Sequence, residues 1–464
     1  MTIKIHNTLS NKKEEFHPQN EKFVSMYVCG ITPYDEVHLG HARVYVVFDI
    51  VKRHLLRRGY RVKHVQNFTD VDDKIIKRSR EKNMKPSQLA QIYIDDYFVQ
   101  TDKLNILRAE EYPRVTQMIP EIINFIKELV DRGFAYETGG DVYFSVEKFK
   151  DYGKLSKRKL KNLKAGARVG ICAEKTSAFD FTLWKRTKEN EPREVAWESP
   201  WGEGRPGWHI ECSVMSSELL GDTIDIHGGG QDLIFPHHEN EIAQSESKTG
   251  KRFVIYWIHN GFVTVNKEKM SKSLNNFFTL KAVFEKYNPR AVRYYLLTQR
   301  YSSPLDFSDD GIEAAKNALQ GMDDAYLKLI SSAKEAATEI TDKDLSGLQE
   351  DFLGALDNDF NSEKALSYLH ELKSLMLKEL FTAGGERLSQ LRKLFEDFTG
   401  TSLGIALPEE HNADRVVHGL LKERNEARKN KNWTESDRLR KLINEKGYRI
   451  SDNEDGSSVL MKKV

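Results

Sequence analysis

The spacing of hydrophobic side chains near the start of the chain predicts a strand, a helix and a second strand in succession. Residues 22–29 are rich in β-branched and aromatic side chains and are followed by Gly30, a pattern typical of a buried strand that ends in a loop. Between Ala42 and Gly59 the apolar side chains recur at helical spacing, and residues 61–66 return to a strand pattern. We therefore expect a βαβ unit of a parallel sheet, in which ligands bind beyond the carboxyl ends of the strands.

Later regions of the chain differ in pattern. Residues 113–201 are charged and less regular, which predicts a module inserted into the sheet. Strand-like segments return at 223–227, before a triple glycine, and at 253–258, and they predict the second half of a nucleotide-binding fold. After about Ser308, amphipathic patterns such as that of residues 365–380 predict a helical bundle. The expected fold class is α/β: a Rossmann-like parallel sheet with an inserted connective module, followed by an α-helical bundle and a small C-terminal domain.

Composition narrows the functional classes. The chain has 464 residues, 39% of them hydrophobic, which is enough for about three domains. Its 71 lysines and arginines balance 70 acidic residues, so any RNA-binding surface must be local. Residues 421–450 hold ten basic and five acidic side chains, which fits an RNA-binding face or an ordinary solvated helix. No apolar run approaches the roughly 18 residues that cross a bilayer, and the polar start lacks a secretory signal, so we expect a cytoplasmic protein without membrane contact.

The cysteines indicate a reducing environment. There are three, Cys29, Cys172 and Cys212, and no two are close in sequence. An odd number of widely spaced cysteines argues against a disulfide framework. From the residues alone, one or two of them could be metal ligands, with buried structural thiols as the default interpretation.

Two short motifs carry candidate chemistry. His38-Leu39-Gly40-His41 falls where the first loop enters the predicted helix, and Lys269-Met270-Ser271-Lys272-Ser273 begins 228 positions after His41. Imidazole and ammonium groups are donors that can stabilise a negative α-phosphate while pyrophosphate leaves. Taken alone, each motif favours a simpler interpretation, a pair of helix-start histidines or a pair of solvated lysines.

Together, in this order and at this separation, the two motifs resemble the signature elements of class I aminoacyl-tRNA synthetases. Further segments resemble the cysteinyl-tRNA synthetases of this class, and they extend over nearly the whole chain: 29–34, 67–74, 207–212, 228–232, 235–241 and 355–361. The resemblance implies an enzyme that makes cysteinyl adenylate from L-cysteine and ATP, with Mg²⁺ accompanying ATP. It also implies transfer of the cysteinyl group to the tRNA for cysteine.

The resemblance implies one zinc ion per chain at the base of the amino-acid pocket. The matching ligands are Cys29, Cys212, His237 and Glu241. The residues themselves show only that His237 and Glu241 are four apart, which places both on one face of a helix, and they leave His238 or Glu239 as alternatives. A soft thiolate binds zinc far better than a serine hydroxyl, so such a site would select cysteine without a separate editing domain.

Other roles also follow from the resemblance, residue by residue. The histidines and lysines of the two motifs would be catalytic and would bind ATP, assisted by glycine and aspartate after the strand at 223–227: His38, His41, Lys269, Lys272, Gly229 and Asp232. Thr69 and Trp208 would line the cysteine pocket. Trp433, Asp437 and Arg440 would contact tRNA. We expect a monomer, because no heptad seam is evident.

The resemblance gives names to the expected domains. Their boundaries are 1–112 and 202–260 for the two halves of the catalytic domain, 113–201 for the connective module, 261–308 for the lysine-motif loop and stem-contact region, 309–406 for the helical tRNA-binding bundle and 407–464 for the anticodon-binding domain.

The chain departs from the family pattern at two places. Asn275 stands where family members commonly have glycine, and asparagine can adopt the same left-handed backbone. Residues 455–460 replace a threonine-tryptophan-arginine element of the tail, which puts tail contacts with the anticodon in doubt.

Three rival functions remain open at this point. One is a paralogous ligase that transfers cysteine to an amino sugar and needs no anticodon domain. The second is a non-catalytic RNA-binding relative, which would be expected to lose the histidine or lysine motif. The third is a zinc hydrolase using His237, His238 and Glu241, although the helical HExxH pattern of such enzymes is missing from the sequence.

Overall fold

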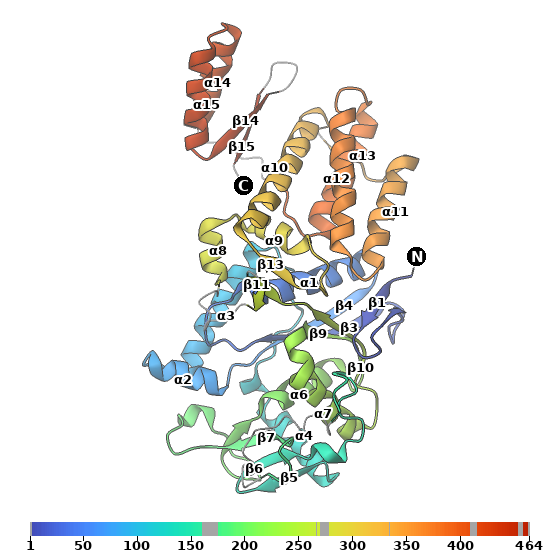
Figure 1. The fold of residues 1–464 in the computed structure, drawn as a ribbon, viewed down its shortest axis with the longest axis vertical. Helices are drawn as coiled ribbons and strands as arrows, with labels where there is room; N and C mark the ends of the chain where they lie inside the picture. Colours follow the sequence, from blue (N-terminus) through green and yellow to red (C-terminus); the bar gives the residue numbers. More distant parts are fainter. Residues whose placement is uncertain are drawn as a thin grey trace. The chain divides into compact units, whose positions relative to one another are not determined.

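The computed structural model describes residues 2–159, 175–265, 267–269, 278–333, 335–408, 415–452 and 458–462. The chain forms two compact units, and its elements are labelled in Figure 1. The first unit comprises Met1–Val283, Tyr301–Asp306 and Asp357–Phe360. The second comprises Phe284–Arg300, Phe307–Leu356 and Asn361–Val464.

A four-stranded parallel sheet in the order β10-β9-β3-β4 forms the centre of the first unit. Its strands are β3 (Phe23–Ile31), β4 (Arg61–Phe68), β9 (Ile224–Gly230) and β10 (Val254–Asn260). Side chains on both faces of β3, β9 and β10 are buried, as expected for parallel strands covered by helices. The predicted βαβ unit and α/β fold class are confirmed.

Helix α1 (Leu39–Arg57) connects β3 to β4. It begins three residues before the first periodic position of the sequence, because the side chain of His38 caps its amino end. The helix ends before Gly59, whose φ of +85° is a left-handed conformation that glycine adopts without strain. The amino end of α1 is thereby placed directly after β3, at the edge of the sheet where ligands bind.

The residues between β4 and β9 contain a second sheet, which is antiparallel with the order β5-β6-β7-β8. It follows α4 (Ile119–Asp131), and its strands are β5 (Ala135–Thr138), β6 (Asp141–Phe144), β7 (Phe181–Arg186) and β8 (Gly204–Pro206). Strands this short offer too few alternating positions to stand out in the sequence, which explains the prediction of a less regular module. Strand β8 leads into α6 (Trp208–Leu220), which packs against β3 and β4.

The first unit contains several further strands and helices, and two elements cross the limits between the units in the sequence. Those of the first unit are β1 (Lys4–Asn7), β2 (Lys12–Glu15), α2 (Asp73–Glu81), α3 (Pro86–Lys103), α7 (Glu239–Thr249), β11 (Val263–Val265) and β12 (Glu268–Lys269). In the sequence, α8 (Leu280–Lys286) and β13 (Leu305–Phe307) span unit boundaries.

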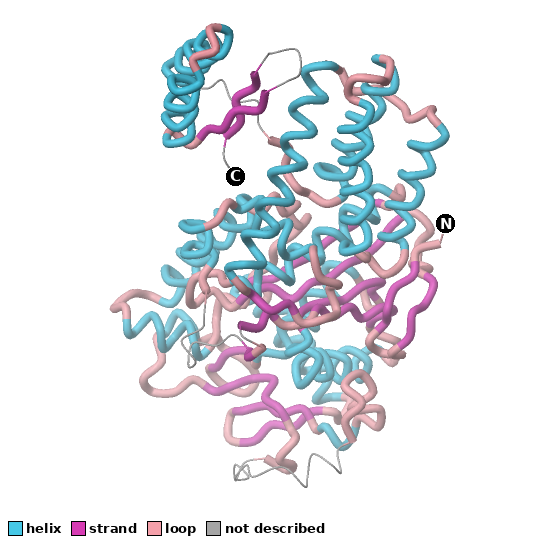
Figure 2. Tube along the Cα trace, turned by 45° about the horizontal axis from the view of Figure 1, so that its top comes forward, coloured by secondary structure: helices cyan, strands magenta, loops and turns pink. Residues whose placement is uncertain are grey.

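The second unit is mostly helical, as the cyan tube of Figure 2 shows. Helix α10 (Asp309–Ser332) packs against α9 (Pro289–Leu297), α12 (Ser362–Glu379) and α13 (Gly385–Glu396), and α11 (Lys343–Asp357) lies between α10 and α12 in the sequence. The predicted helical bundle is confirmed. Among the described helices, none is long and apolar enough to cross a membrane.

The C-terminal part of the second unit combines two helices with a β-hairpin. Helices α14 (Arg415–Lys429) and α15 (Trp433–Glu445) pack together, and β14 (Tyr448–Asp452) pairs with β15 (Ser458–Lys462). A small core centred on Val417 and Ile443 joins the helices to the hairpin. The sequence predicted a small C-terminal domain and left a solvated helix at 421–450 as one alternative, but it predicted neither the helix pair nor the hairpin.

The close approach of α1 to the sheet makes Gly228 of β9 intolerant of a larger side chain. A Cβ atom there would meet Cζ of Phe48 at 2.0 Å and the carbonyl oxygen of Ile258 at 3.0 Å. Because Phe48 is buried and cannot swing into solvent, we expect Gly228→Ala to destabilise the protein by about 1–3 kcal/mol, measured as a fall in Tm.

The matched control is Gly347→Ala in α11, where a Cβ atom would have no neighbour within 4 Å. This substitution should leave Tm unchanged or raise it, because alanine favours a helix interior by about 1 kcal/mol over glycine. Equal Tm values for the two variants would contradict the packing described here.

Candidate active site

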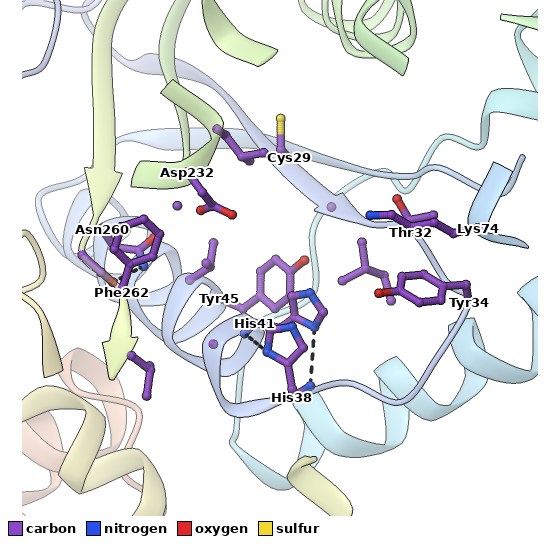
Figure 3. Close-up of a pocket in the computed structure, with 18 of the residues that line it drawn as sticks. Cys29, Thr32, Tyr34, His38, His41, Tyr45, Lys74, Asp232, Asn260 and Phe262 are labelled. Carbon is purple, nitrogen blue, oxygen red and sulfur yellow. Dashed lines mark hydrogen bonds between the residues drawn. The ribbon is translucent and has the colours of Figure 1, made fainter. Parts of the chain in front are cut away.

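A cavity of about 330 Å³ opens at the carboxyl ends of β3, β9 and β10 (Figure 3). Open parallel sheets bind ligands at this edge. Polar side chains and glycine backbone make up much of its wall. Among the lining residues are Cys29, Thr32, Tyr34, His38, His41, Lys74, Trp208, Gly230, Asp232 and Asn260.

His38 and His41 line the cavity and cap α1 together. The backbone N–H of His41 donates to Nδ1 of His38 at 3.3 Å, and the N–H of His38 donates to Nδ1 of His41 at 3.4 Å. The two rings stack with centroids 3.5 Å apart. Because each Nδ1 accepts a hydrogen bond, each neutral ring carries its proton on Nε2. Each ring is therefore a hydrogen-bond donor of the kind that binds phosphate oxygens.

The four predicted metal ligands converge beside this cavity. Cys29 comes from β3, Cys212 from α6, His237 from the helical turn η5 (Ile234–His238) and Glu241 from α7. Their donor atoms all lie within 4.8 Å of one another, and all four side chains are buried. The two Sγ atoms are 3.8 Å apart, and Nε2 of His237 lies 3.0 Å from Oε1 of Glu241. Bonds of about 2.0–2.3 Å to a central zinc ion would place tetrahedral ligands at such separations.

The four groups influence one another's ionisation. The hydrogen bond from Cys29 lowers the pKa of Cys212 to about 6, whereas burial raises the pKa of Cys29 well above its usual value. Burial opposes the charged form of His237, but Glu241 and Cys212 raise its pKa to about 10. Burial also opposes the carboxylate of Glu241, but His227 and His237 lower its pKa to about 2. The cluster thus favours a thiolate and a carboxylate, which are ligand forms that a divalent cation binds.

Of the alternatives left by the sequence, Glu239 points away from the cluster. Its carboxylate accepts hydrogen bonds from the backbone N–H groups of Gly153 and Ser156 at 3.0 and 2.7 Å. His238 does lie in the cluster, with Nε2 3.3 Å from Sγ of Cys29. Cys29, His227, His238 and Glu241 form a second group whose donor atoms lie within 4.8 Å of one another.

Sequence reasoning missed three histidines around the ligands. Nδ1 of His209 lies 2.9 Å from Nδ1 of His237, and Nε2 of His227 lies 2.8 Å from Oε2 of Glu241. His259 contacts His238, with ring nitrogens 2.7 Å apart. His209 lies inside a segment that carries the family resemblance, and His227 directly precedes the triple glycine, so their neighbourhood in the sequence was the available signal.

The two residues expected in the cysteine pocket differ in position. Trp208 lines the cavity, and its ring stacks on that of His237 with centroids 4.4 Å apart. Thr69 is buried and donates to the Glu211 carboxylate at 3.0 Å, and it is not among the residues that line the cavity. The structure therefore brings Trp208 to the four predicted ligands, whereas Thr69 is buried and is not among the residues that line the cavity.

Of the residues predicted to bind ATP, only some line the cavity. Asp232 lines the cavity, and Gly229 is buried in β9, where a Cβ atom would meet Leu233 and His238. Lys269 ends β12, which pairs with β11. Lys272 lies outside the described residues.

The three expected tRNA contacts lie together on α15. Trp433, Asp437 and Arg440 are exposed, and their spacing of four and three residues places them on one face of the helix. The guanidinium of Arg440 also pairs with Asp452 of β14 at 3.2 Å.

Comparison with known proteins agrees with this geometry. Residues 15–317 match the family model described as tRNA synthetases class I (C) catalytic domain, and residues 412–458 match that of the cysteinyl-tRNA ligase anticodon binding domain. The chain is 82% identical to a cysteine–tRNA ligase of Endomicrobium trichonymphae, over the full length of both chains. The chain belongs to the cysteine–tRNA ligase family. A second family member, from Geobacillus sp. (strain WCH70), is 45% identical over 98% of each chain.

Solved structures of more distant proteins share the fold. The methionyl-tRNA synthetase of Mycobacterium tuberculosis in complex with methionyl-adenylate has 15% sequence identity and a TM-score of 0.58, covering 83% of this chain and 90% of its own. A leucyl-tRNA synthetase complex of Agrobacterium radiobacter K84 has 11% identity and a TM-score of 0.62, covering 84% and 85%. These likenesses confirm the class I synthetase fold of this member of the cysteine–tRNA ligase family.

The cluster predicts the effect of removing one thiol on metal content. Cys212→Ala leaves three donors around the centre of the group, so we expect bound zinc to fall from about one ion per chain to near zero, measured by mass spectrometry of the metal after dialysis. Cys172→Ala is the control for loss of a thiol, because Cys172 belongs to none of the segments that carry the family resemblance. Retention of zinc by Cys212→Ala would show that this thiol is not a ligand.

Proposed function

We propose that the protein is a cysteine–tRNA ligase, which activates L-cysteine with ATP and Mg²⁺ to cysteinyl adenylate and transfers the cysteinyl group to the 3′ end of the tRNA for cysteine. The main observation in support of cysteine as the amino acid is the cluster beside the cavity. Two thiols, an imidazole and a carboxylate gather within 4.8 Å beside a cavity lined by His38 and His41. Family membership and the identity with cysteine–tRNA ligases support the same reaction.

We assign Cys29, Cys212, His237 and Glu241 as ligands of one zinc ion. The set with both thiols is preferred over that with His227 and His238, because thiolate is the softer donor and suits zinc. A zinc ion held by these residues would offer a coordination position that suits the sulfur of cysteine better than the hydroxyl of serine. Trp208 lines the cavity and stacks on His237, so its ring would form part of the amino-acid pocket beside the zinc site.

The adenylation step is assigned to hydrogen-bond donors rather than to a protein nucleophile. Nε2 of His38 and of His41 would donate to phosphate oxygens as negative charge grows on the α-phosphate. Lys269 and Lys272 would neutralise the leaving pyrophosphate. Asp232 would accept hydrogen bonds from the ribose at the other side of the cavity, and we assign Gly229, near the end of β9, to the ATP site.

The transfer step needs tRNA, and we assign its recognition to the second unit. Trp433, Asp437 and Arg440 form the proposed contact face on α15, where an aromatic ring can stack on a base and the charged groups can bind its edges. We also propose the six domain boundaries predicted from the sequence, in which residues 407–464 form the anticodon-binding domain. We propose that the enzyme acts as a cytoplasmic monomer.

The rival functions fit less well. A ligase for an amino sugar would need no anticodon domain, yet residues 412–458 match the cysteinyl-tRNA ligase anticodon binding domain. A non-catalytic relative would not be expected to keep both histidines aimed by reciprocal hydrogen bonds. Cysteine-dependent exchange of pyrophosphate into ATP, followed by charging of purified tRNA, tests the proposal against both rivals. Absence of either activity from metal-loaded protein would overturn it.

The role of His41 can be tested in the exchange reaction. We expect His41→Asn to lower kcat by about 10²–10³-fold, the usual effect of removing one donor aimed at developing charge. His17→Asn is the control, because the His17 side chain is 74% exposed and is not part of the cavity wall. Equal rates for the two variants would rule out the proposed donor role.

The role of zinc can be tested through selectivity. A pocket that fits two near-isosteres without a specific ligand discriminates by about 10²-fold or less. We therefore expect chelation of the metal to lower the ratio of kcat/KM for cysteine over serine to that level, with recovery on addition of Zn²⁺. If the metal-free protein rejected serine as strongly as the zinc-loaded protein does, selection by zinc would be wrong.

A further inference from the structure

Lys74 is a cation of the cavity to which neither motif assigns a role. Of the described residues that line the cavity, it is the only lysine or arginine. Figure 3 shows its side chain beside Thr32, with the ammonium nitrogen directed into the cavity, across from Asp232. The same view places His38 and His41 below the space between them. A substrate that lies across the cavity, with one end at Asp232, would therefore bring an anionic group at its other end close to this ammonium group.

The positive charge of Lys74 is not neutralised by an ion pair among the described residues. Among the described residues no ion pair involves Lys74, although Asp72 and Asp73 precede it in the chain. Asp73 instead pairs with Lys185 and Arg205, and the Asp72 side chain accepts the backbone N–H of Lys74 at 2.9 Å. The ammonium lies over the ring of Tyr34, 5.4 Å from its centroid. That contact positions the amine without neutralising it.

The position of Lys74 in its helix is unfavourable for stability. It is the second residue of α2, after Asp73, and the first turn of a helix favours acidic side chains over basic ones. Asp72 and Asp73 follow that rule, whereas Lys74 breaks it. A local rule broken without an evident structural gain is typical of a functional position.

We infer that Lys74 binds a phosphate group of a substrate in this cavity. The inference rests on the proposed function, because both nucleotide substrates of that reaction bring phosphates to the cavity. One source is the polyphosphate of ATP in the adenylation step. The other is the phosphodiester next to the 3′-terminal nucleotide of tRNA in the transfer step. In either case the contact is a charge-assisted hydrogen bond from Nζ to a phosphate oxygen.

The test compares Lys74→Gln, Lys74→Arg and Lys77→Gln in the zinc-loaded full-length protein. Lys77 is the matched control, because it is exposed on the same helix and does not line the cavity. Pyrophosphate exchange without tRNA reports the ATP contact, and single-turnover transfer from preformed adenylate reports the tRNA contact. We expect Lys74→Gln to lower one of these rates by about 10–100-fold, the usual effect of losing one charged hydrogen bond. Lys74→Arg should recover most of the loss, and Lys77→Gln should match the wild type.

The outcomes separate the possible explanations. A loss confined to transfer assigns the phosphate to tRNA, and a loss already present in exchange assigns it to ATP. The Tm of Lys74→Gln should equal or exceed that of the wild type, so a lowered rate cannot be ascribed to unfolding. Wild-type rates for Lys74→Gln in both assays, or equal losses in the Gln and Arg variants, would overturn the phosphate contact. Failure of the wild type itself in exchange would instead overturn the proposed function.

Discussion

The site depends on holding four polar, ionisable groups together in buried positions. Cys29, Cys212, His237 and Glu241 are all buried, and burial of charge without compensation is costly. The arrangement is sustained by mutual compensation, since the imidazoles stabilise the Glu241 carboxylate and one thiol donates to the other. Surrounding histidines extend this network outward to His209 and His259. The four groups must therefore stay close together to compensate one another, and the surrounding strands and helices hold them there.

Sheet order explains how such distant residues meet. Strand β9 pairs with β3 although nearly two hundred residues separate them in the chain, and this pairing sets His227 beside the strand that carries Cys29. The intervening antiparallel sheet ends in β8, which passes into α6 and so delivers Cys212 to the same place. The inserted module therefore does more than lengthen the loop between two halves of a nucleotide fold. It determines where one of the thiols enters the cluster.

Periodicity and motif spacing were sufficient to predict the parallel sheet, α1, the helical bundle and the position of His38 and His41 at a helix entrance. They could not predict the antiparallel sheet, because its strands are three to six residues long and give little alternation. Nor could they distinguish Glu239 from Glu241, since the difference depends on a loop near Gly153 that binds one carboxylate and leaves the other for the cluster. Thr69 marks another limit, because periodicity gives no sign that it is buried and donates a hydrogen bond to Glu211.

The reciprocal cap at the start of α1 ties the protonation of two rings to the integrity of a helix turn. A ring that gained a second proton would carry hydrogen on Nδ1 and could no longer accept the backbone N–H that it holds now. The same two rings hold the first turn of α1 and line the cavity, so any substitution at either position changes the helix cap and the binding surface together.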